Sequence, residues 1–118
     1  MNNTNPLSEV MTVTGPVSPE DLGFTLMHEH VFLSILADYL DTDRVLDDPD
    51  SARAELQLFK DAGGGTVVDQ TNRGLEQNPA GVREMARDTG LNIVLGCGWY
   101  RDPFYEPRLH RETTDQIA

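Results

Sequence analysis

The sequence predicts an α/β protein that forms the N-terminal part of a (β/α)8 TIM barrel, with about three barrel strands and an incomplete barrel. Three observations support this: apolar runs alternate with helical patterns, the helices have their own start and stop residues, and the chain has 118 residues. Alternating strands and helices are typical of parallel sheets with right-handed crossovers. A complete barrel has about 250 residues. We therefore expect residues 1–118 to form a single incomplete domain, with residues 1–9 as a flexible lead-in.

Two helices have clear signals in the sequence. The first is expected over residues 49–62, where proline stands at the first helical position and apolar side chains recur at i, i+4 and i+7. The glycine run at 63–65 is expected to end it. The second is expected over residues 79–89, again with proline at the first position and with glycine just past the end. Another helical pattern begins at Thr113.

Apolar runs at residues 24–30, 66–71 and 91–96 are expected to be strands of the barrel. The second run does not alternate with polar residues, which is typical of parallel sheets covered on both faces. Residues 10–13 are expected to be a separate β-prone run that Gly15-Pro16 ends, and residues 18–23 one helical turn. Residues 31–40 are expected to form a short helix, and residues 41–48 a loop.

The run at residues 24–30 ends in two histidines, His28 and His30. Residues i and i+2 of a strand lie on one face, so both imidazoles project to one side and Glu29 to the other. Imidazole is a common metal ligand, and parallel α/β proteins build active sites at the carboxyl ends of strands. A metalloprotease helix is excluded, because Phe32 stands where His-Glu-x-x-His needs histidine. A cupin fold is disfavoured by the helical patterns. We therefore expect His28 and His30 to bind metal on a first barrel strand.

Composition limits the partners and the compartment. The formal net charge is -11, from 20 acidic and 9 basic residues, which disfavours nucleic acid and anionic membrane surfaces as partners. Cys97 is the single cysteine, so no internal disulfide forms, and we expect it to pack as a small side chain. The first residues lack a secretory pattern, and no apolar run approaches the ~18 residues of a membrane span. These features predict a cytoplasmic protein.

Several stretches together resemble the phosphotriesterase family of the amidohydrolase superfamily. The most specific is Gly-Phe-Thr-Leu-Met-His-Glu-His at residues 23–30. The others are Val-Thr-Gly-Pro-Val at 13–17, Gly-Thr-Val-Val-Asp at 65–69, Thr-Gly-Leu-Asn-Ile-Val at 89–94 and Gly-Trp-Tyr at 98–100. The resemblance spans nearly the whole chain and points to lactonase-like and phosphotriesterase-related members.

The resemblance implies a distorted barrel with two divalent metal ions, expected to be zinc, bridged by a hydroxide. It implies that His28 and His30 are first-strand ligands of the more buried ion, and that Tyr100 lies near the hydroxide and the substrate. The hydroxide would attack a small-molecule lactone, ester or phosphotriester (organophosphate). The other metal ligands would lie beyond residue 118, and a homodimer is considered for the full-length parent.

Three other residues are interpreted from their positions. Asp69, at a strand end, either orients a metal ligand through a hydrogen bond or makes an ordinary strand-end hydrogen bond. Trp99 either lines the substrate pocket or belongs to the core. His110 lies in a charged loop and is expected to be exposed.

Two other hypotheses stand beside this hydrolase. In one, the 118 residues form a catalytically silent truncated half-barrel that cannot close and exposes its sheet edges. In the other, the parent acts on another amidohydrolase substrate class, such as an amide or a nucleic-acid end. We expect the isolated chain to show neither turnover nor tight metal binding, because two histidines leave most of a metal's coordination shell open.

Overall fold

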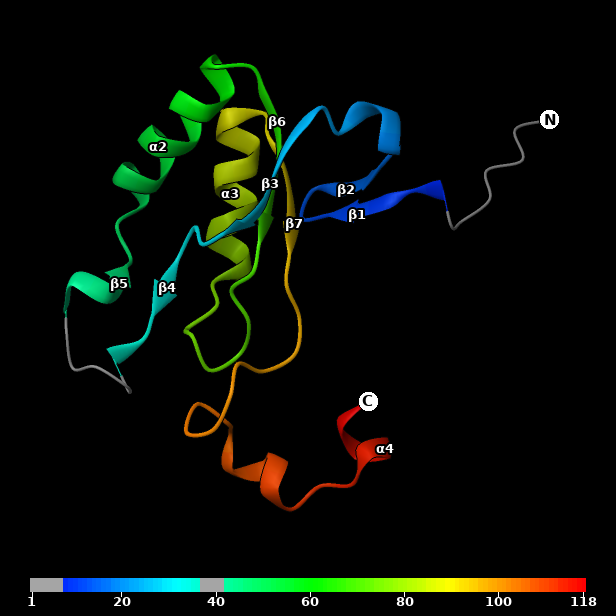
Figure 1. Cartoon of the computed structure of the whole chain (residues 1–118), viewed down its shortest axis with the longest axis vertical. Helices are drawn as coiled ribbons and strands as arrows, with labels where there is room; N and C mark the ends of the chain where they lie inside the picture. Colours follow the sequence, from blue (N-terminus) through cyan, green and yellow to red (C-terminus); the bar gives the residue numbers. More distant parts are fainter. Residues whose placement is uncertain (1–7, 37–41) are drawn as a thin grey trace.

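The computed structural model describes residues 8–36 and 42–118 (Figure 1). At its centre is a three-stranded parallel sheet in the order β3-β6-β7, with β3 at Phe24–Glu29, β6 at Gly64–Asp69 and β7 at Asn92–Leu95. Helix α2 (Pro49–Asp61) lies in the connection from β3 to β6, and α3 (Pro79–Thr89) lies in the connection from β6 to β7. The predicted α/β class and the three predicted parallel strands are confirmed.

The other elements are short. They are β1 (Val10–Thr12), β2 (Gly15–Val17), β4 (Leu33–Ser34), β5 (Val45–Leu46), α4 (Thr114–Ile117) and 3-10 turns at Pro19–Asp21, Thr42–Arg44 and Pro107–His110. Strand β1 pairs antiparallel with β2, and β4 pairs antiparallel with β5. The turn predicted at 18–23 and the helix predicted after Thr113 are confirmed. Within the described ranges, no helix is long and apolar enough to cross a bilayer.

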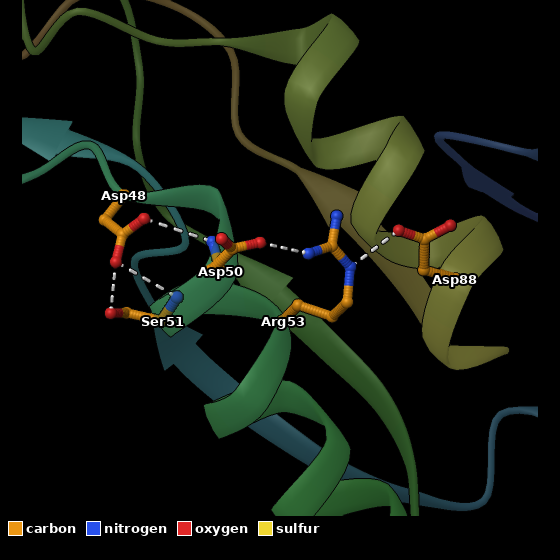
Figure 2. Close-up of polar contacts among 5 residues, drawn as sticks. All are labelled: Asp48, Asp50, Ser51, Arg53 and Asp88. Carbon is orange, nitrogen blue, oxygen red and sulfur yellow. Dashed lines mark hydrogen bonds and ion pairs between the residues drawn. The ribbon is translucent and has the colours of Figure 1, made fainter.

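Side chains at the start of α2 explain why this segment is helical. Figure 2 shows the Asp48 carboxylate accepting hydrogen bonds from the Ser51 hydroxyl and from the backbone N–H groups of Asp50 and Ser51. The hydroxyl, followed by the two N–H groups, lowers the pKa of Asp48 below its ordinary value. Arg53 donates to Asp50 and to Asp88 of α3, each at 2.8 Å. The cap fixes the start of α2, and Arg53 ties α2 to α3.

The ends of α3 follow the same logic. The Asn78 side chain accepts a hydrogen bond from the backbone N–H of Gly81 at 2.9 Å. At the other end Gly90 adopts φ 69°, the left-handed conformation that favours glycine, and its N–H bonds the carbonyl of Ala86. The predicted bounds of this helix are confirmed.

Both helices pack on one face of the sheet and form the core with it. The core side chains are Val31, Phe32, Leu56, Val67, Val82, Met85, Ala86, Leu91 and Ile93, with Ala52 and Phe59 of α2 packed against them. The segment after β7, coloured orange to red in Figure 1, lies beyond the carboxyl ends of the strands. The opposite face of the sheet has no helix on it in the described part of the chain.

Strands β3 and β6 approach closely at their starts. The Thr66 hydroxyl donates to the Leu22 carbonyl at 2.5 Å. A Cβ atom at Gly65 would collide with the same carbonyl oxygen and press on the Cα of Gly23. The missing side chain of Gly65 therefore allows this close contact.

The helix predicted over residues 31–40 is wrong at Leu33 and Ser34, which form β4. The Ser34 N–H donates to the carbonyl of Leu75 at 3.0 Å, and β4 pairs with β5 inside the predicted loop. These bonds to distant residues stabilise extended backbone, which the local spacing of apolar residues could not reveal. Residues 37–40 of this prediction, and residues 1–7 of the predicted lead-in, lie outside the described residues.

Two smaller predictions are also wrong. Gly15 and Pro16 do not end the first β run but belong to β2, and the turn lies at residues 13–14. Proline is tolerated there because a strand of a two-stranded sheet has an unpaired side for it. Cys97 is exposed and does not pack as predicted, since it lies in the loop after β7.

Candidate functional site

The two predicted metal ligands lie together at the carboxyl end of β3. The ring centroids of His28 and His30 are 5.4 Å apart, with an angle of 67° between the rings. A tetrahedral zinc ion held at about 2.0–2.1 Å by two imidazole nitrogens places its ring centroids about 5 Å apart. His28 is exposed and His30 is half-buried, so a ligand from solvent can reach the pair. The donor type and the ring spacing both fit a divalent metal.

A hydrogen bond from the neighbouring strand holds the His30 ring. His30 Nδ1 lies 2.9 Å from the hydroxyl oxygen of Thr71, a residue just past the end of β6. Because Nδ1 is engaged, Nε2 is the nitrogen left for a metal. Thr71 was not singled out from the sequence. The sequence feature that could have indicated it is its position two residues after Asp69, at the carboxyl end of the strand next to the one that carries the histidines.

Asp69 is fully buried, with 0% of its surface exposed. Its carboxylate accepts hydrogen bonds from the backbone N–H of Thr71 at 2.8 Å and from that of Val31 at 3.3 Å. Val31 directly follows His30, so Asp69 holds the backbone on both sides of the His30–Thr71 contact. Both sequence interpretations of Asp69 therefore have a physical basis: it makes strand-end hydrogen bonds, and through them it reaches a candidate ligand.

Gln77 ties the end of β6 to the end of β7. Its Nε2 donates to the carbonyl oxygens of Thr71 at 2.7 Å and Gly96 at 2.8 Å. The Gly96 N–H in turn donates to the carbonyl of Asp69 at 2.7 Å. The loops that follow the two strands are thus fixed relative to each other at the edge where the histidines lie.

Trp99, in the loop after β7, has two guanidinium groups near its ring. The Arg73 and Arg108 Cζ atoms lie 5.6 and 5.3 Å from its ring centroid, within the range of cation–π contacts. Arg108 also donates to Glu106 at 2.7 Å, and this bond is the main cause that lowers the pKa of the Glu106 carboxyl. Trp99 packs within this charged cluster and is absent from the core cluster of buried apolar residues.

Tyr100 is 47% exposed and lies in the same loop. Its ring packs edge-on against Phe104 at 5.3 Å, and Arg101 lies 5.4 Å from its centroid. Its described ring contacts are therefore within its own loop and do not include the histidines. His110 is exposed, as the sequence predicts.

The described residues do not by themselves complete a metal site around the two histidines. Among residues 8–36 and 42–118, no three His, Cys, Asp or Glu side chains are grouped so that they could hold a metal ion. A cavity of about 670 Å³ lies nearby, between α2 and β3, and is lined mainly by apolar residues such as Leu26, Leu56 and Phe59. His30 lies at the border of this cavity.

Comparison with known proteins identifies the family. The model of the phosphotriesterase family matches residues 8–117, which is almost the whole chain. The chain belongs to the phosphotriesterase family. This confirms the resemblance drawn from the residue 23–30 block and the other stretches.

Similarity to individual proteins is consistent with this membership. The N-acetyltaurine hydrolase of Xenopus tropicalis is 29% identical over 93% of this chain and 40% of its own length. The resiniferatoxin-binding protein of Rhodobacter sphaeroides superposes with a TM-score of 0.82 at 29% identity, over 93% of this chain and 39% of its own. A lactonase of Listeria monocytogenes superposes with a TM-score of 0.74 at 31% identity, over 86% of this chain and 33% of its own. The chain therefore spans 33–40% of the length of these relatives, and its fold matches the corresponding part of the two solved structures.

Proposed function

We propose that this chain supplies the first-strand ligands, His28 and His30, of a metal-dependent hydrolase with two divalent ions, expected to be zinc. The observation that carries the proposal is the pair of imidazoles at the carboxyl end of β3, 5.4 Å apart and with His30 Nδ1 already engaged. Membership of the phosphotriesterase family supports it. The remaining ligands would come from further strands, since the described residues group no third ligand with the pair.

The chain's own residues hold and orient the ligands. His28 and His30 offer neutral nitrogens, which bind a divalent ion without cancelling its charge. Thr71 fixes one ring, and Asp69 fixes the backbone around it. When bound, the ions supply an activated water near neutral pH and polarise the oxygen of the bond under attack.

Lactones, esters and phosphotriesters are the proposed substrate classes. The similarity to the Listeria lactonase favours a lactone, and the family favours a phosphoryl or carboxyl ester. The similarity to the Xenopus N-acetyltaurine hydrolase favours a second candidate, an N-acyl amide. Tyr100, exposed beyond the strand ends, is proposed to contact the substrate, and Trp99 is proposed to line the pocket from the same loop.

The test is a double substitution, His28→Asn with His30→Asn, in the full-length protein that contains residues 1–118. We expect loss of both bound zinc and turnover, because two of the nitrogens that would hold the ion are removed. Zinc content per protein and initial rates on a lactone, a phosphotriester and an N-acyl amide measure this. The matched control is His110→Asn, which removes an exposed histidine from another part of the chain and should retain zinc and turnover. Undiminished turnover in the double variant would refute the proposal.

The 118-residue chain itself provides a second test. Purified alone, it should bind no stoichiometric zinc after dialysis and should hydrolyse none of the three substrates, because the pair leaves most of the coordination shell open. Tight zinc together with turnover in this chain would show that the other ligands are not needed.

A further inference from the structure

The contact between Thr71 and His30 joins two strands at the point where the proposed metal site begins. The two residues are 41 positions apart in sequence, and the Nδ1 to Oγ1 distance is 2.9 Å. We propose that Thr71 is a positioning residue that holds His30 with its proton on Nδ1 and with the Nε2 lone pair free. Its importance for metal binding rests on the proposed function; its effect on the ring does not.

Without a hydrogen-bond partner, an imidazole does not keep its proton on Nδ1 or hold one ring orientation. Neutral histidine carries its proton on either nitrogen, and the ring turns about χ2 within a broad, roughly two-fold well. A ligand that binds through Nε2 needs the proton on Nδ1 and one ring orientation, and a hydrogen-bond acceptor at Nδ1 provides both. The Thr71 oxygen is placed to be that acceptor for His30. His28, on the same strand, is exposed.

Thr71 is itself held so firmly that it can act as a fixed point. Its side chain is buried, with 1% exposed. Its N–H donates to the Asp69 carboxylate at 2.8 Å, and its carbonyl accepts from Gln77 at 2.7 Å. Both backbone groups of Thr71 are therefore bonded by side chains, which leaves the hydroxyl aimed at His30.

The same Asp69 carboxylate reaches the other side of the contact. Its second oxygen accepts from the N–H of Val31, the residue that follows His30. One buried carboxylate, that of Asp69, therefore holds both the backbone after His30 and the backbone of Thr71, whose hydroxyl contacts the His30 ring. A shift of the backbone after His30 relative to that of Thr71 would break a hydrogen bond to this carboxylate, so the arrangement resists a backbone displacement that would misplace Nε2.

The first experiment uses the 118-residue chain without metal. Nitrogen-15 NMR of the ring nitrogens at pH 8, where histidine is neutral, reports which nitrogen carries the proton. In the wild-type chain we expect His30 to show a protonated Nδ1 and a bare Nε2. In Thr71→Val, which keeps the shape and removes the hydroxyl, His30 should shift to a mixture of both forms, like His28. Thr71→Ser, which restores the hydroxyl, should restore the Nδ1 proton, and a purely structural role would not show this rescue.

The second experiment measures zinc affinity in the full-length protein by competition with a chelator. Loss of such a hydrogen-bond partner typically lowers metal affinity about 10- to 100-fold, and we expect a loss of this size for Thr71→Val and near wild-type affinity for Thr71→Ser. The spread of backbone amide signals in the 118-residue chain shows whether each variant is folded. Should Thr71→Val unfold the chain, the ring form of wild-type His30 still tests the inference, because a proton on Nε2 would overturn it.

The outcomes separate this inference from the proposed function. A wild-type His30 with its proton on Nε2, or a ring form unchanged in Thr71→Val, overturns the positioning role and leaves the metal ligands untouched. The expected ring forms, combined with undiminished zinc in the His28/His30 double variant, support the positioning role and overturn the proposed function.

Discussion

Strands β3 and β6 lie side by side in one sheet but differ in how they are buried. In β6 the side chains of Thr66, Val67 and Asp69 are at most 1% exposed, because this strand has a neighbour on each side and helices on one face. In β3, an outer strand, Met27 is 66% exposed. His28 is exposed and His30, just past the end of the strand, is half-buried. The central strand stabilises the fold, and the outer strand carries the candidate chemistry.

This difference explains how the site is supported. The outer strand does not fix its own histidines, since few side chains pack on it. The fixed points come from β6 and the loop after it, through Asp69, Thr71 and Gln77. The buried strand thus positions the side chains that the exposed strand offers to solvent.

The largest expected effect on the unfolding free energy comes from a side chain between the sheet and the helices that cover it. Ile93→Ala in β7 removes a side chain that is fully buried among the helices, and such a truncation costs about 2–5 kcal/mol of unfolding free energy. Met27→Ala in β3 should change the unfolding free energy by no more than about 0.5 kcal/mol, since its side chain is exposed. Urea denaturation of the 118-residue chain measures both. Equal costs for the two variants would contradict the contrast between buried and exposed side chains of the sheet.

A smaller effect comes from two acidic residues that face each other in the register of β3 and β6. Asp69→Asn replaces an acceptor of two backbone N–H bonds by an amide that can accept with only one side, and an unpaired buried donor costs about 1–3 kcal/mol. Glu29→Gln, its exposed register partner, is the matched control and should cost about 0.5 kcal/mol or less. Urea midpoints at pH 7 compare them. If Glu29→Gln were the costlier change, β3 would hold the site and not β6.

The smallest expected effect on stability comes from Asp48, which caps the N-terminus of α2, one of the two helices that cover the sheet. Its hydrogen bonds lower its pKa in the folded chain, so the stability they contribute is present above the unfolded pKa of about 4 and is lost as pH falls through the folded value. Asp48→Ala should therefore destabilise the chain modestly at pH 7, and the difference from wild type should shrink below pH 4. Urea midpoints at pH 7, 4 and 3 measure this. A difference independent of pH would show that the carboxylate charge does not contribute.

Local signals predicted the elements that depend on local causes. Proline at the first helical position, capping side chains and terminal glycines set the bounds of α2 and α3, and these signals are visible in sequence. The apolar runs predicted β3, β6 and β7 for the same reason. The i, i+2 spacing also predicted that His28 and His30 share a face.

Features set by distant residues were missed. Strand β4 exists because Ser34 bonds Leu75 and because β4 pairs with β5, and neither contact leaves a local pattern. Thr71 reads as one more residue of a β-prone run until the parallel register brings it beside His30. Asp69 was recognised, but its two N–H partners lie on separate segments and could not be assigned from sequence.

Gly65 sets the spacing of β3 and β6 at the end of the strands opposite the histidines. A Cβ atom at this position would collide with the Leu22 carbonyl just before β3, so a methyl group there would push the start of β3 away from β6. Protein engineering aimed at new substrates can therefore vary the loops beyond the strands. Position 65 must remain glycine, because its missing side chain sets how closely the two strands approach.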